Sequence, residues 1–105
     1  GRWNADEWVA RAARLFPGFD ATMHAITNAS AAIDGDLATL DADVQAHHVV
    51  VVDGVTRRYT IAGAYHDRLA RTPDGWRIVA KTLQVWRTEG DPDVMRIAVE
   101  RTGGR

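Results

Sequence analysis

The sequence contains no cysteine among its 105 residues. That absence excludes disulfides, thiolate zinc sites and thiol nucleophiles, but it leaves the cellular compartment open. Long apolar runs are also missing: the longest, Val49–Val52, falls far short of the ~20 residues that cross a bilayer. The first residues do not form the apolar segment of a signal peptide. We therefore expect a cytoplasmic domain without membrane contact.

Neither sign of charge is in excess. Thirteen Lys and Arg residues oppose 14 Asp and Glu residues, which gives a net charge of −1. The basic residues are scattered along the chain, so no concentrated basic face is available to displace counterions from phosphates. We expect no nucleic-acid partner.

What the sequence does have is enough apolar content for one core. With 46% hydrophobic residues in 105, residues 1–105 are expected to form a single domain. The segment from Asn4 to Phe16 has a helical period, with Asn4 as its N-cap and Pro17 as its end. The apolar stripe of this helix consists of Trp8, Ala12, Leu15 and Phe16.

After the helix the apolar period changes from about 3.6 to 2, and Asp-Gly pairs mark hairpin turns. The pattern predicts antiparallel strands at 21–33, 37–52, 55–71 and 76–88, with 94–101 as a short fifth strand or tail. Strands this long favour bends or bulges, and a bent sheet tends to curl around a filler. The predicted fold class is α+β: a strongly bent antiparallel sheet wrapped around the N-terminal helix.

Alternation also predicts which side chains share a face. Small residues on the inward face, such as Ala42, Ala46 and Gly63, should leave room for a ligand cavity on the concave side. Three runs are expected to share an inward face: Leu40, Ala42, Val44 and Ala46; Ile61, Gly63, Tyr65 and Asp67; and Val79, Lys81, Leu83 and Val85.

His24 is the first candidate for chemistry, in an apolar run with Asn28 four residues later. An imidazole has an ordinary pKa near ~6.5, so at neutral pH it can accept a proton as a general base. The alternative is a core histidine whose ring is satisfied by the backbone or by Asn28. Tyr65 could donate to a developing oxyanion or sit at the rim. Lys81, on an inward face, needs an anion or must extend to solvent.

A metal site is not expected. His47 and His48 are neighbours on a strand and therefore point to opposite faces, and with His66 they match no known ligand spacing. Asp41 and Asp43 share the polar face, where a solvated acidic patch is the ordinary explanation. We expect no cofactor.

Five pieces of the chain in order resemble a known family: "TMH" with Asn28 after it, "DGD", "GAYHD", "PDGWRI", and a basic residue followed by Trp86. They are similar to the SnoaL-like branch of the nuclear transport factor 2-like superfamily over roughly residues 3 to 90. That branch includes scytalone dehydratase, bile-acid dehydratases and the hexachlorocyclohexane dehydrochlorinase.

The resemblance implies an α+β cone around an apolar pocket, in which a strand histidine, here His24, takes a proton from the substrate. It implies pocket positions for Tyr65, for Phe19 as a wall, and for Lys81 where some members carry an arginine. The family's orienting aspartate lies on a helix with no counterpart in residues 1–105. We therefore expect the natural protein to have a segment before Gly1.

Together these inferences predict a cofactor-independent dehydratase, isomerase or cyclase acting on a small, largely apolar, ring-containing substrate. The alternative is a non-catalytic ligand-binding or assembly domain of the same fold. We expect His24, Tyr65 and Lys81 in one cavity, with Phe16 and Phe19 on its wall. Trp86 is expected on the outer sheet face, as part of a homodimer interface.

Overall fold

The computed structural model describes residues 1–103. Four of its strands match the predicted ranges closely, and a short strand at the N-terminus was not predicted. No helix in the described residues combines the length and apolarity that crossing a bilayer requires. The order of elements is β1 (Arg2–Asn4), α1 (Ala5–Leu15), the 3-10 turn η1 (Phe16–Gly18), β2 (Ala21–Asp34), β3 (Leu37–Val52), β4 (Val55–Thr72), β5 (Gly75–Gly90) and α2 (Asp93–Arg101).

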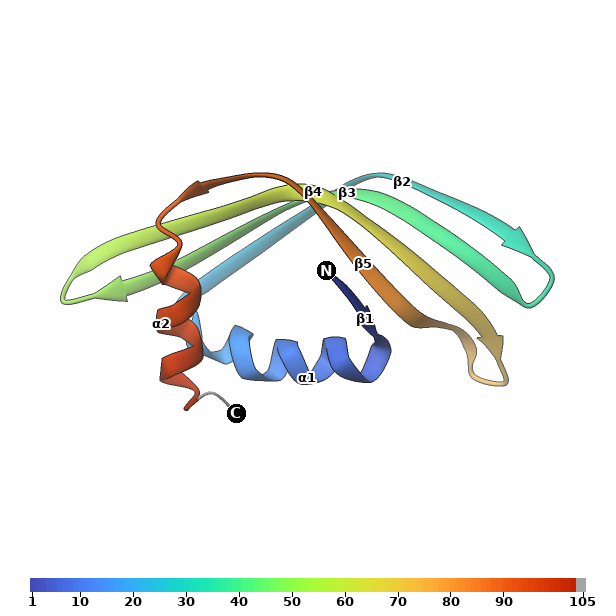
Figure 1. The fold of residues 1–105 in the computed structure, drawn as a ribbon, viewed down its shortest axis with the longest axis horizontal. Coiled ribbons are helices and arrows are strands. Elements are labelled where there is room, and N and C mark those ends of the chain that lie inside the picture. Colours follow the sequence, from blue (N-terminus) through green and yellow to red (C-terminus); the bar gives the residue numbers. More distant parts are fainter. Residues whose placement is uncertain (104–105) are drawn as a thin grey trace.

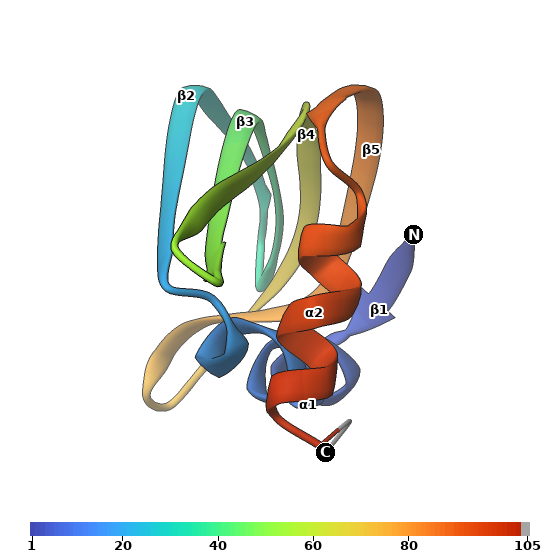
Figure 2. The same cartoon turned by 90° about the vertical axis from the view of Figure 1, so that its left-hand side faces the viewer.

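The five strands form one antiparallel sheet in the order β1-β5-β4-β3-β2. Figure 1 shows this sheet as a long arch with both helices beneath its concave side, while the β2–β3 and β4–β5 hairpins extend beyond α1. Figure 2, seen from the α2 end, places β2 at one edge and β1 at the other.

The arch is bent but not strongly curled, so the predicted cone is only partly realised. The molecule measures 53 × 27 × 19 Å and has a radius of gyration of 15.5 Å. A compact domain of this length has a radius near ~13 Å. The difference reflects the hairpins that project past the helices, where no element lies beneath the sheet for it to wrap around (Figure 1).

Helix α1 begins as predicted. The Asn4 side chain accepts from the Glu7 amide at 2.9 Å, and the Glu7 carboxylate accepts from the Asn4 amide at 3.0 Å. This reciprocal capping box satisfies two amides that the first helical turn leaves without partners. The helix then packs Leu15 against the core, and Pro17 lies in the turn that follows. Its orientation brings Trp8 over the sheet.

The predicted strand or tail at 94–101 is wrong, because this segment forms α2. Val94 and Ala98 are fully buried one helical turn apart, which is the spacing of an apolar helix face. Asp93 and Arg101 stand at the ends where the helix dipole favours their charges. That pattern was present in the sequence, but its β-branched residues also suited a strand.

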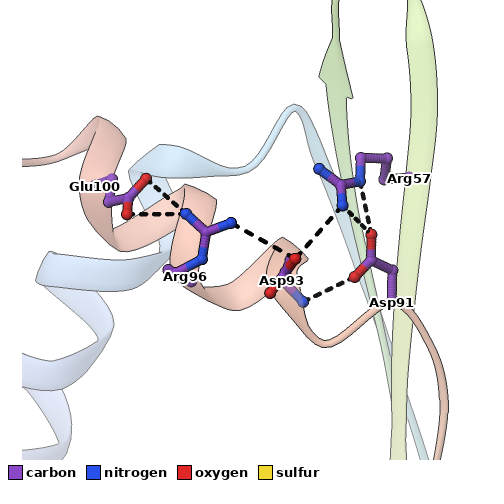
Figure 3. Close-up of polar contacts among 5 residues, drawn as sticks. All are labelled: Arg57, Asp91, Asp93, Arg96 and Glu100. Atoms are coloured by element: carbon purple, nitrogen blue, oxygen red, sulfur yellow. Dashed lines mark hydrogen bonds and ion pairs between the residues drawn. The ribbon is translucent and has the colours of Figure 1, made fainter.

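Ion pairs attach the start of α2 to the sheet. Figure 3 shows Arg57 of β4 joined to Asp91 and Asp93, and Arg96 joined to Asp93 and Glu100. Asp91 also accepts from the Asp93 amide at 2.9 Å, which fills the role of an N-terminal cap. Arg96 and Glu100 are therefore already engaged with neighbours on α2.

Two bulges in β5 break the predicted alternation. At the first, Gly63 pairs with Val85 and Ala62 with Arg87. A Cβ atom at Gly63 would lie 1.9 Å from the Gln84 carbonyl oxygen. The expectation that Gly63 leaves room for a ligand is therefore wrong: its missing side chain is what lets the β5 backbone approach.

At the second bulge, Leu69 pairs with Ile78 and Arg68 with Ala80, so Val79 is an unpaired extra residue. Val79 therefore does not continue the face that carries Lys81, contrary to the predicted run. A bulge adds one residue to one strand, and this cannot be read from apolar alternation alone.

Candidate functional site

A small cavity lies between α1 and the concave face of the sheet, with a volume of about 20 Å³. That is room for about one water molecule. His24 and Tyr65 both line it, which confirms the predicted register, and Phe16 is on its wall as expected. The complete lining is Trp8, Arg11, Leu15, Phe16, His24, Val44, Ala46, His48, Ile61, Tyr65, Leu83 and Met95.

His24 enters the cavity from β2, where it pairs with Ala46. Although β2 is exposed along its whole length, the imidazole packs edge-on against the Phe16 ring, with 5.6 Å between the centroids. Partial desolvation lowers the pKa of His24 below its ordinary value, and the charge of His47 adds to this effect. A lowered pKa keeps the imidazole neutral at pH 7, so it can accept a proton.

His48 lies beside His24, with 5.6 Å between the ring centroids, and was not predicted to belong to the site. His48 is only 3% exposed, and the Phe19 ring packs over it with 4.9 Å between the ring centroids. Burial lowers the pKa of His48, against the opposing effect of its hydrogen bond to Tyr59. The alternation that placed Val44 and Ala46 on the concave face reaches His48 two residues later, so the signal was available.

The tautomer of His48 is fixed by its surroundings. Nδ1 lies 3.0 Å from the Tyr59 carbonyl oxygen, which can only accept a hydrogen bond. In the neutral ring Nδ1 therefore carries the proton, and Nε2 keeps a free lone pair. His47, as predicted, points to the other face, where Nδ1 lies 3.0 Å from the Thr60 hydroxyl.

Tyr65 contributes a buried phenol to the cavity, 9% exposed and edge-on to Trp8 at 5.8 Å between the ring centroids. Burial raises the pKa of Tyr65, and the charge of Arg11 opposes that rise. The hydroxyl therefore stays protonated at neutral pH and remains a hydrogen-bond donor. Arg11 reaches the cavity from α1 and was not predicted there.

Lys81 does not line this cavity, so the prediction of one shared space for all three side chains is wrong on this point. Its Nζ donates to both carboxylate oxygens of Asp67 at 2.9 Å and lies 3.9 Å from the Tyr65 ring centroid. Lys81 instead borders a separate depression of about 230 Å³ beside Trp8 and Val9. The anion that an inward lysine requires is supplied by the protein itself.

Asn28 and Phe19 also differ from expectation. Asn28 sits at a bulge of β2 with φ of +51°, and its amide donates to Asp43 at 2.8 Å. Asp43 is on the face opposite its neighbour Val44, so Asn28 points away from the cavity. The Phe19 ring packs against the His48 ring and does not line the cavity itself.

The outer face carries its own polar contacts. His66 Nδ1 lies 2.6 Å from Asp41, and Nε2 lies 3.1 Å from Gln84. The hydrogen bond to Asp41 is the main cause that raises the pKa of His66, with Gln84 second. Across residues 1–103, no three His, Cys, Asp or Glu side chains gather closely enough to form a metal site.

Comparison with known proteins identifies the family. The family model for the SnoaL-like domain matches residues 1–82. The protein Kfla4162 of Kribbella flavida is 34% identical and has a TM-score of 0.68, over 89% of this chain and 61% of its own. No curated protein is significantly similar to this chain.

Two more distant structures share the fold. A candidate aromatic ring hydroxylase of Novosphingobium aromaticivorans is 23% identical with a TM-score of 0.70, over 86% of this chain and 62% of its own. A variant of Rv3472, a Mycobacterium tuberculosis protein of unknown function, is 22% identical with a TM-score of 0.58, over 90% of this chain and 60% of its own. The chain thus spans about three fifths of each matched structure.

The family model covers residues 1–82, which is most of the chain, and the Kribbella protein shares the fold over 89% of the chain. This chain belongs to the SnoaL-like family of the nuclear transport factor 2-like superfamily.

Proposed function

We propose that this domain binds a small, largely apolar, ring-containing molecule and catalyses a cofactor-independent dehydratase, isomerase or cyclase type of reaction. The observation that carries the proposal is the meeting of two neutral imidazoles, His24 and His48, with the Tyr65 phenol in one apolar cavity. Such a set contains both a proton acceptor and a hydrogen-bond donor, which proton abstraction next to a carbonyl requires.

In this mechanism His24 removes the proton from carbon. Its lowered pKa leaves the imidazole free to accept at pH 7. Tyr65 donates a hydrogen bond to the oxygen on which negative charge develops, because burial keeps its phenol protonated. His48 lies beside His24 with 5.6 Å between the ring centroids, and its fixed tautomer leaves Nε2 as a second proton acceptor.

The cavity volume limits where the substrate body can lie. About 20 Å³ admits only the reacting edge of a molecule, not a whole ring. The body would occupy the larger groove beside the cavity, between α1 and α2. The name of the Novosphingobium relative adds aromatic ring compounds to the ligands worth testing, without indicating the reaction here.

The second candidate is a non-catalytic binding domain, and the small cavity favours it. The two functions separate in one experiment. Hydroxylated and halogenated ring compounds are screened for binding and for turnover, and any active compound is then tested with His24→Gln, His48→Gln and Tyr65→Phe. A catalytic site predicts loss of turnover in His24→Gln, with the thermal midpoint shifted by only a few degrees.

His66→Gln is the matched control, because it changes an imidazole on the outer face that contacts Asp41 and Gln84. It should leave turnover intact. Binding with no turnover of any compound would favour the non-catalytic function. Full activity in His24→Gln with loss in His48→Gln would transfer the role of base to His48.

A further inference from the structure

A groove of about 460 Å³ lies between α1 and α2, next to the histidine cavity. Arg11, Leu15 and Met95 line both spaces. The groove has an apolar floor of Leu15, Met95 and Val99, bordered by charged side chains. Its volume is in the range of small-molecule sites, unlike that of the cavity beneath it.

The charges bordering the groove are not balanced. Arg96 is joined to Asp93 and Glu100, so these charges already neutralise one another (Figure 3). Arg11 and Arg14 form no ion pair with any carboxylate in the described part of the chain. The groove therefore presents two positive charges above an apolar floor.

Arg11 forms no ion pair because Glu7, the acidic residue best placed to pair with it, binds another group. Glu7 stands four residues before Arg11, which is the favourable spacing for a helical ion pair. Glu7 instead accepts the Asn4 amide in the capping box. The Arg11 guanidinium is half-buried and held over two indole rings, 5.1 Å from the Trp3 centroid and 5.7 Å from the Trp8 centroid.

A guanidinium held in this way is preorganised to bind an anion. The contacts with both indoles hold the guanidinium in place, so little freedom is lost when it binds a carboxylate through two parallel hydrogen bonds. Arg14 lies in the last turn of α1, where the negative end of the helix dipole opposes a bound anion. This opposition is smaller for a singly charged carboxylate than for a phosphate dianion.

We propose that Arg11, assisted by Arg14, binds the carboxylate of a small ring-containing acid whose apolar body lies on Leu15, Met95 and Val99. Conversion of the acid rests on the proposed function, whereas its binding at Arg11 does not. The acid group is anchored by Arg11, which also lines the cavity that holds His24 and His48. The substrate class is thereby narrowed from apolar ring compounds to ring-containing carboxylic acids.

The test compares two probes of the same shape, 2-naphthoate and 2-naphthamide, by calorimetric titration of the 105-residue chain. The acid should bind at least about tenfold more tightly than the neutral amide, as expected for a hydrogen-bonded ion pair. The preference should fall as sodium chloride is raised. Equal affinities for the two probes, or binding of neither, would overturn the proposal.

Variants assign the preference to its residues. Arg11→Met keeps an unbranched stem over the indoles and should abolish the preference for the acid, Arg14→Met should weaken it, and Arg11→Lys should keep part of it. Arg77→Met removes an exposed arginine on β5 and is the control that should change nothing. An undiminished preference in folded Arg11→Met would reject the site. Acid binding through Arg11 with full turnover in His24→Gln would reject the proposed base while leaving this site standing.

Discussion

Lys81 and Asp67 form a buried ion pair in which Nζ donates to both carboxylate oxygens at 2.9 Å, under the rings of Tyr65 and Trp8. Their side chains are 12% and 6% exposed. Removing one partner leaves the other charge without compensation in a poorly solvated place. Each of the two charges therefore stabilises the folded state only when the other is present.

We therefore expect Lys81→Met to lower the free energy of unfolding by about 3–5 kcal/mol. The double variant Lys81→Met with Asp67→Leu should recover much of that loss, because it removes both charges. Urea unfolding of the single and double variants measures the difference. A single variant as stable as the wild type would mean that Asp67 reaches solvent when its partner is gone.

Gly63→Ala should destabilise the sheet by about 1–3 kcal/mol, because its new methyl group meets the Gln84 carbonyl oxygen in the adjacent strand. Gly35→Asn is the control: its position has positive φ and open space around it, which asparagine tolerates. Thermal unfolding should show a clear drop in midpoint for the first variant and a small change for the second. Equal drops would contradict the role assigned to Gly63.

Stability should fall as the solution is acidified below about pH 6.5, in part because of His48. Burial lowers the pKa of His48 in the folded protein, so the unfolded chain binds more protons in this range and is favoured. The sign is opposite for His66, whose raised pKa contributes stability at acidic pH that is lost as pH rises through the folded value. Relative to the wild type, His48→Gln should reduce the loss of unfolding free energy on acidification below about pH 6.5. His66→Gln should reduce the loss that occurs as pH rises above about 6.5. The reverse pattern would refute both pKa directions.

A homodimer through the outer sheet face remains a prediction. Trp86 is 57% exposed at the first β5 bulge, where a large aromatic in solvent suggests a covered surface. Trp86→Lys should shift the mass measured by light scattering at micromolar concentration from dimer to monomer. Val55→Lys, at the β3–β4 turn, is a control that should not. A monomeric wild type would refute the prediction.

The sequence was most informative where local chemistry decides the structure. Asp-Gly turns and period-two alternation located the four long strands, and Asn4 located the start of α1. The same alternation placed His24 and Tyr65 on one face, because the pairing across β3 preserves it.

Features that depend on contacts between distant segments could not be predicted in the same way. The bulges at Gly63 and Val79 arise where β5 must fit β4, and nothing in the apolar pattern marks them. The partner of Lys81 was visible as a polar residue on the correct face, but only the packed structure shows that Asp67 binds it. Arg11 was assigned no role from the sequence, because its position depends on Trp3, which belongs to a strand that was not predicted.

The bulge at Asn28 has a consequence for the behaviour of the protein at high concentration. β2 is an outermost strand, and such a strand offers unpaired backbone groups to which another molecule can add a strand. Its regular pairing with β3 runs from Ala21 to Thr27 and resumes at Ser30, so the left-handed Asn28 interrupts the edge. Held by its hydrogen bond to Asp43, this interruption shortens the flat template along which fibrils could grow.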